Sequence, residues 1–122
     1  MTLRQDVADD YAFPVTHEAL AEGVASLCAE RTVDLRTQPV VAELLRGRQV
    51  VQNDCRTAYG DPAFQRMLET YGGLAAQIVT PIVRDGGLLA ILSLHQLGAP
   101  RHWTEAEIAA ARRTAERIGA LL

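Results

Sequence analysis

Gln77-Ile-Val-Thr-Pro-Ile-Val83, Arg84-Asp-Gly-Gly87 and Leu88-Leu-Ala-Ile-Leu-Ser-Leu-His95 are the three consecutive segments that decide the fold. The Asp-Gly pair between two apolar runs is a strong hairpin signal, because a tight turn needs positive φ at its centre. In the third segment both alternating sets of side chains are apolar, which is typical of a strand inside a sheet that is covered on both faces. We therefore predict two antiparallel strands at 77–83 and 88–95, with Leu92 in the core.

The C-terminal residues predict a long helix. Thr104-Glu-Ala-Glu107 is a capping box, in which the threonine accepts a hydrogen bond from the backbone and the glutamate reaches back to it. Apolar residues then recur at steps of three and four along one face, which we expect to cover the sheet. The apolar surface extends around the side of this helix near its end, and such a surplus favours a homodimer. The predicted contacts are Ala111, Ala115, Ile118 and Leu122.

Two shorter helices are predicted upstream of the hairpin. Asp61-Pro62 is a cap followed by a proline at the first helical position, so a helix is expected over 61–71, and Pro39 similarly opens a helix that ends before Gly47. Residues 48–52 between them are typical of a short strand. The fold class is therefore α+β, with helices on both faces of the sheet and helix 61–71 opposite the C-terminal helix.

The first 36 residues carry weaker signals. Residues 2–12 alternate between apolar and polar and could form an edge strand. Residues 17–30 fit a helix at several positions, although Gly23 weakens that prediction. Because this part is less regular, the fold is predicted most firmly over 37–122 of the single domain expected at 1–122.

Composition excludes several classes of protein. The chain has 122 residues, 48% of them hydrophobic, and a net charge of −3, which argues against a nucleic-acid or anionic-membrane partner because both need clustered positive charge. Its start lacks a secretory signal pattern, and no run reaches the length of a membrane span. Cys28 and Cys55 are too few for a disulfide framework or a four-ligand zinc site. We expect a cytoplasmic protein with reduced thiols and no metal.

The order of elements and four motifs resemble a GAF domain. The motifs are Glu43-Leu-Leu-Arg-Gly-Arg-Gln-Val-Val-Gln-Asn-Asp54, Thr80-Pro-Ile-Val-Arg-Asp-Gly-Gly87, Leu89-Ala-Ile-Leu-Ser-Leu-His95 and Pro100-Arg-His-Trp-Thr-Glu-Ala-Glu107. The resemblance covers 37–122, and its last motif is most similar to GAF domains of bacterial sensor histidine kinases and phytochrome-like photoreceptors. It implies a sensory module that binds a small molecule, often as a dimer, and relays a signal through its last helix to a histidine kinase or another output domain. The ligand or cofactor stays unidentified at this point.

The resemblance and the residue types together indicate where a ligand could bind. An apolar stripe on helix 61–71, an acidic residue and a histidine at two strand ends could frame a small-molecule site, although each of these is also consistent with ordinary core or capping roles. Neither cysteine lies in the Cys-x-x-His pattern that the resemblance associates with covalent bilin attachment. The candidate ligand-binding residues are Asp54, Cys55, Phe64, Met67, Tyr71 and His95.

Two other functions remain open from the sequence. One is a structural dimerisation domain that binds no ligand. The other is a small thiol-dependent redox enzyme, disfavoured because only two cysteines are present and their positions do not match the sulfoxide reductases of this family. No phosphate-binding glycine loop or catalytic triad pattern occurs, so we predict a module without catalysis of its own.

Overall fold

The computed structural model describes all 122 residues. The chain forms five strands, three α-helices and two short 3₁₀ turns. In chain order these are β1 (Thr2–Gln5), β2 (Val15–Glu18), η1 (Leu35–Thr37), α1 (Pro39–Leu45), β3 (Val50–Gln52), η2 (Cys55–Thr57), α2 (Pro62–Thr70), β4 (Leu74–Arg84), β5 (Gly87–Leu97) and α3 (Glu105–Leu121). The three predicted strands and three predicted helices of the region after residue 36 are all present.

One antiparallel sheet has the strand order β2-β1-β5-β4-β3. β4 and β5 form the predicted hairpin, and its turn has positive φ at Asp85 (53°) and Gly86 (78°). β5 lies in the centre, as its two apolar faces indicated. The edge-strand prediction for residues 2–12 is wrong, because β1 pairs with β5 on one side and with β2 on the other.

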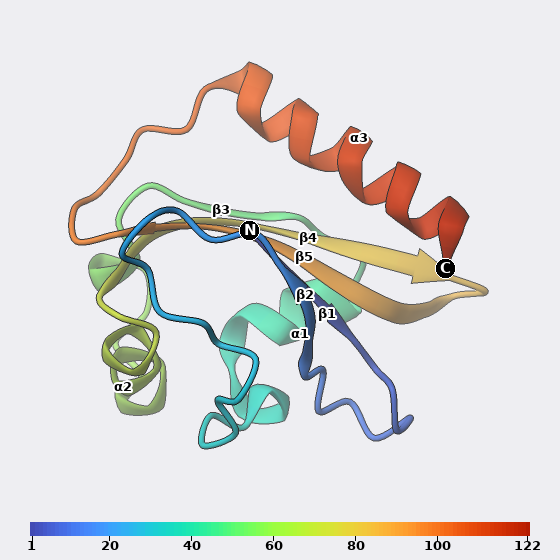
Figure 1. Ribbon diagram of the computed structural model, residues 1–122, viewed down its shortest axis with the longest axis horizontal. Coiled ribbons are helices and arrows are strands. Elements are labelled where there is room, and N and C mark those ends of the chain that lie inside the picture. Colours follow the sequence, from blue (N-terminus) through green and yellow to red (C-terminus); the bar gives the residue numbers. More distant parts are fainter.

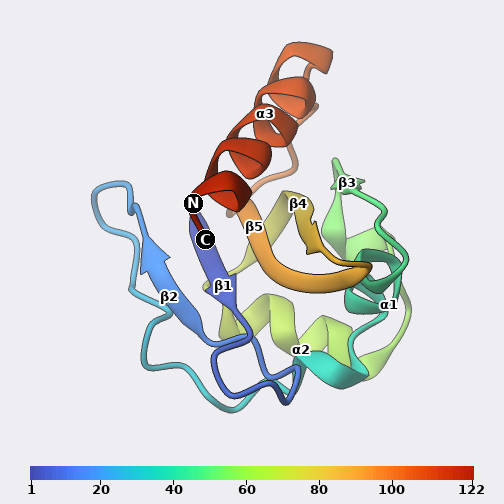
Figure 2. The same ribbon diagram turned by 90° about the vertical axis from the view of Figure 1, so that its right-hand side faces the viewer.

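The sheet separates two unlike layers (Figures 1 and 2). α3 crosses one face alone, whereas α1, α2 and the connecting loops lie against the other. On the α3 face, Ala111 and Ala115 are each only 4% exposed and pack against the sheet. Both small side chains are therefore occupied within the chain. At the end of α3, Leu121 is exposed beside Ile118 and Leu122, which are partly buried against the core. The homodimer stays a prediction.

The ambiguous segment 17–30 contains no helix. β2 occupies the start of this range, and the chain then runs as an irregular loop with positive φ at Gly23. Glu18 holds the loop, because its carboxylate accepts hydrogen bonds from the Ser26 hydroxyl and from the Leu27 backbone N–H. Local side-chain bonds of this kind compete with helix formation.

Candidate functional site

A small cavity lies between the sheet and the α1/α2 layer. Its volume is about 40 Å³, and we call it the inner cavity. Apolar side chains of α1 and of strands β4 and β5 form most of its wall, and polar groups converge on it from both layers. The residues that matter for its chemistry are Arg4, Gln38, Met67, Tyr71, Ser93 and His95.

Arg4, Tyr71 and His95 form one contact unit at the cavity. β1 directs Arg4 toward the α2 side because its neighbour Leu3 faces α3, as strand alternation requires. The Arg4 guanidinium donates to the Tyr71 hydroxyl at 3.1 Å and to the backbone oxygen of Phe13 at 3.0 Å. The ring of His95 stacks on that of Tyr71 with centroids 6.1 Å apart. β1, the end of α2 and β5 thus each contribute one side chain to this unit.

Burial and positive charge set the ionisation of this unit. Desolvation lowers the pKa of His95 to about 3, and the positive charges of Arg4 and the chain's N-terminus act in the same direction. His95 is therefore neutral at physiological pH and can donate or accept a hydrogen bond. Burial raises the pKa of Tyr71, so its hydroxyl stays protonated.

Two further polar side chains at the cavity have unused hydrogen-bonding capacity. Gln38 is 5% exposed, and its Oε1 is buried without a donor. Ser93 lies on β5 at the cavity wall, and its hydroxyl makes no hydrogen bond to the protein. Gln77, by contrast, donates to Oε1 of Gln52 at 2.8 Å. Buried polar groups are normally satisfied, so the orphan acceptor of Gln38 marks a place where a bound molecule fits.

Three of the six predicted ligand residues line the inner cavity, namely Met67, Tyr71 and His95. The other three have structural roles. Asp54 caps η2 by accepting from the Arg56 backbone N–H at 3.1 Å, and Phe64 is fully buried with its ring edge against Tyr59. Cys55 is also fully buried, and desolvation raises the pKa of its thiol to about 12.

Arg4, Gln38 and Ser93 were missed by sequence reasoning. A weak signal existed for Ser93, which is polar within an otherwise apolar strand. None existed for Arg4, because its partner Tyr71 is 67 residues away in the chain.

A second hollow adjoins the inner cavity. It has a volume of about 270 Å³ and is walled mainly by apolar residues of the loop after β2, including Leu20, Val24 and Leu27. We call it the outer hollow. Tyr71 and His95 line both spaces, so their stacked rings form part of the partition between them.

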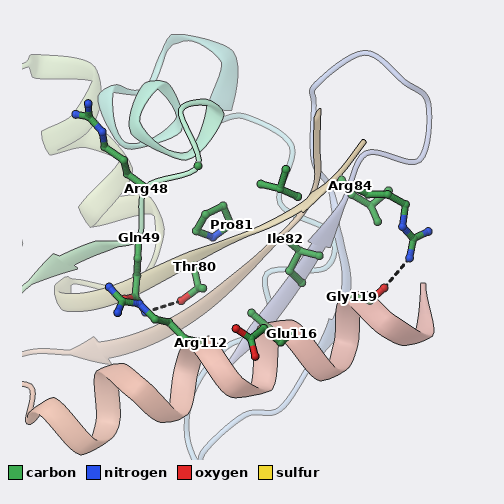
Figure 3. Close-up of a pocket in the computed structure, with 13 residues that line it drawn as sticks. Arg48, Gln49, Thr80, Pro81, Ile82, Arg84, Arg112, Glu116 and Gly119 are labelled. Carbon is green, nitrogen blue, oxygen red and sulfur yellow. Dashed lines mark hydrogen bonds between the residues drawn. The ribbon is translucent and has the colours of Figure 1, made fainter. Parts of the chain in front are cut away.

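The largest hollow, about 760 Å³, lies on the other face between α3 and β4 (Figure 3). Arg48 and Arg84 lie at opposite ends of it, and Arg112 and Glu116 lie between them on α3. Arg84 donates to the backbone oxygens of Gly119 and Leu122, both at 2.6 Å, and Gln49 donates to Thr80 and to the backbone oxygen of Ile108. These polar groups hold α3 in place, so we assign this groove a structural role.

No group of three or more metal-ligating side chains occurs in the chain. None of its helices is both long enough and apolar enough to cross a bilayer.

Comparison with known proteins identifies the family. The family model of the GAF domain matches residues 3–122. The chain belongs to the GAF family. A search of curated proteins found no sequence match for this GAF domain.

Solved structures similar to this GAF domain come from cyanobacteriochromes. The receptor PixJ is 28% identical with a TM-score of 0.78, and the alignment covers 99% of this chain and 79% of that one. The blue-light-absorbing form of the Thermosynechococcus elongatus PixJ GAF domain is 26% identical with a TM-score of 0.71, over 99% and 75% of the two chains. A far-red-absorbing protein with bound biliverdin IXα is 21% identical with a TM-score of 0.78, over 98% and 76%, and shows the shared fold alone. Photoreceptor GAF domains are sensory, and this chain is similar to them.

Proposed function

We propose that this GAF domain is a sensory module that binds a small molecule at the inner cavity and transmits binding to α3 through the central strands. The observation that carries the proposal is an apolar-walled cavity at which a few polar groups meet, among them the orphan Oε1 of Gln38, which is the usual composition of a small-molecule site. Similarity to chromophore-binding photoreceptors supports the same function.

The route to α3 is short. Ser93 faces the inner cavity, whereas its neighbour Leu92 packs in the cluster that includes Ala115 of α3. A ligand that moves the cavity side of β5 therefore moves the surface on which α3 rests. An output domain, for which a histidine kinase is our candidate, would receive the signal from α3.

The ligand is smaller than a bilin in this conformation. Small-molecule pockets typically measure about 300–1,000 Å³, and the inner cavity measures about 40 Å³. Neither cysteine supports covalent attachment there, since Cys55 is buried away from the cavity with a raised thiol pKa and Cys28 lies in the loop after β2. We propose a non-covalent ligand and no catalysis.

A thermal-shift screen of small metabolites tests the proposal. A ligand raises the unfolding temperature in proportion to its occupancy of the native state. Ser93→Val places methyl groups in the cavity and should abolish the shift without lowering stability, because a β-branched residue suits a strand. Val83→Thr, at an exposed position of β4, is the matched control and should retain the shift. A screen without any stabilising compound would favour the ligand-free dimerisation domain instead.

A further inference from the structure

We infer that the ligand is a carboxylate with an apolar body, whose carboxylate pairs with Arg4 in the inner cavity while the body occupies the outer hollow. This inference rests on the proposed function and specifies the class of ligand.

The first argument is the charge of Arg4. Arg4 is 7% exposed, and no carboxylate oxygen lies within 4.0 Å of its guanidinium, whereas five other arginines form surface ion pairs. The nearest acidic influence is Glu30, which lines a neighbouring hollow with Arg4 and interacts with it without an ion-pair contact. A guanidinium has five N–H donors, and only two hydrogen bonds, both to neutral oxygens, engage this one. A buried charge is costly unless it is paired, and the planar fork of arginine fits a carboxylate in two-point contact. An anion bound beside Arg4 would supply the ion-pair partner that its guanidinium lacks.

The second argument is the size and lining of the two spaces. A cavity needs about 10–15 Å³ to hold one water, so the inner cavity at about 40 Å³ accommodates a group of a few atoms such as a carboxylate. The hydroxyl of Ser93 is free to donate to it. The outer hollow is much larger and mainly apolar, and it meets the inner cavity at the Tyr71–His95 stack. A molecule that passes beside this stack places its charged end next to Arg4 in the inner cavity and its apolar body in the outer hollow.

Octanoate and octan-1-ol are the probes, because they share a chain length and differ in charge. We expect octanoate to raise the unfolding temperature of the full chain, with octanol at least tenfold weaker in calorimetric titration. Arg4→Met keeps the length of the side chain and removes the charge, and it should weaken octanoate at least tenfold while leaving octanol unchanged. Arg66→Met, at an exposed position of α2, is the control and should bind like the wild type.

The outcomes separate this inference from the function on which it rests. Equal affinity for the two probes, or unchanged octanoate binding in Arg4→Met, overturns the carboxylate inference but leaves a small-molecule site. Absence of binding by both probes also overturns it, and the metabolite screen then decides on the site itself. The ligand-free Arg4→Met protein should be as stable as the wild type or more so, since an unpaired buried cation is lost; a drop in stability together with normal octanoate binding would assign Arg4 a purely structural role. Should Arg4→Met fail to fold, Arg4→Lys keeps the charge without the two-point fork and should bind octanoate more weakly than the wild type does.

Discussion

The two faces of the sheet differ in how their charged groups are partnered. On the α3 face, most polar side chains are paired at the rim: Trp103 donates its indole N–H to the Gln52 backbone oxygen at 3.1 Å, and Arg84 donates to the backbone oxygens of Gly119 and Leu122. The Oε1 of Gln49 is the one buried acceptor there without a donor. A groove of about 760 Å³ remains between α3 and β4. On the α1/α2 face, the buried Arg4 has no carboxylate in ion-pair contact, although Glu30 lines a neighbouring hollow with it, and Gln38 has an orphan acceptor beside the inner cavity.

This difference indicates that the α3 face is structural and that the α1/α2 face binds the proposed ligand. Each face has one orphan amide acceptor, Gln49 on the α3 face and Gln38 on the α1/α2 face, but only the α1/α2 face also buries a charge without an ion-pair contact. Such a charge is stabilised when a ligand supplies the missing partner. The α3 face should therefore respond to substitution as ordinary core. The α1/α2 face should respond to pH and ligands.

Leu92→Ala tests the packed face and should have the largest effect. Leu92 is 2% exposed and contacts the cluster beneath α3, so its truncation removes buried surface and leaves a cavity. We expect a loss of about 2–5 kcal/mol in the free energy of unfolding, measured by urea denaturation. Val83→Ala, which truncates a half-exposed side chain on β4, should change it by less than about 0.5 kcal/mol. Equal effects of the two substitutions would contradict the core position of β5.

The pH dependence of stability tests the ionisation of His95 on the α1/α2 face. The unfolded chain binds a proton at His95 below about pH 6.5, whereas the native chain binds it only near the lowered pKa of about 3, so stability is full above pH 6.5 and falls as the pH decreases toward 3. In His95→Gln, the unfolding midpoint should decline less between pH 6.5 and 4 than in the wild type. His17→Gln, at an exposed position, is the control. Parallel pH profiles of wild type and His95→Gln would refute the neutral state of His95.

Thr104→Ala should have a smaller effect, again on the packed face. The Thr104 hydroxyl accepts from the Glu107 backbone N–H at 3.1 Å, and the Glu107 carboxylate accepts from the Thr104 N–H at 3.0 Å. Loss of the cap costs about 1 kcal/mol, which urea denaturation resolves. Thr104→Ser keeps the hydroxyl and should restore most of the stability; if it does not, the cap is not the source of the effect.

Leu121→Arg should leave the stability of the fold unchanged and alter only assembly. Leu121 is 86% exposed at the end of α3 and continues the apolar surface of Ile118 and Leu122. We expect light scattering to give about twice the 13.3 kDa chain mass for the wild type and the single mass for this variant. Leu45→Arg, exposed on α1, should remain dimeric. A wild-type mass near that of one chain would reject the homodimer.

Local signals made the packed face predictable. The Asp85-Gly86 turn, the Thr104 capping box and the Asp61-Pro62 helix start each act within a few residues, and each is present in the structure. The candidate site was predicted only in part. Helical spacing and a strand end were the signals for Met67, Tyr71 and His95, which line the inner cavity. The same kinds of signal selected Asp54, Cys55 and Phe64, but Asp54 caps η2 and the other two lie in the core.

By itself the sequence determined the α+β class, the central hairpin and the helix that covers one face. It also indicated, through its motifs, membership of the GAF family. Those features depend on side-chain alternation, helical periodicity and turn geometry, which neighbouring residues impose on one another. Only the tertiary structure decided that β1 inserts between β2 and β5, and that it carries Arg4 to Tyr71 across a separation of 67 residues. A buried charge without a partner is a property of three-dimensional surroundings, because it depends on which distant groups are absent as much as on which are near.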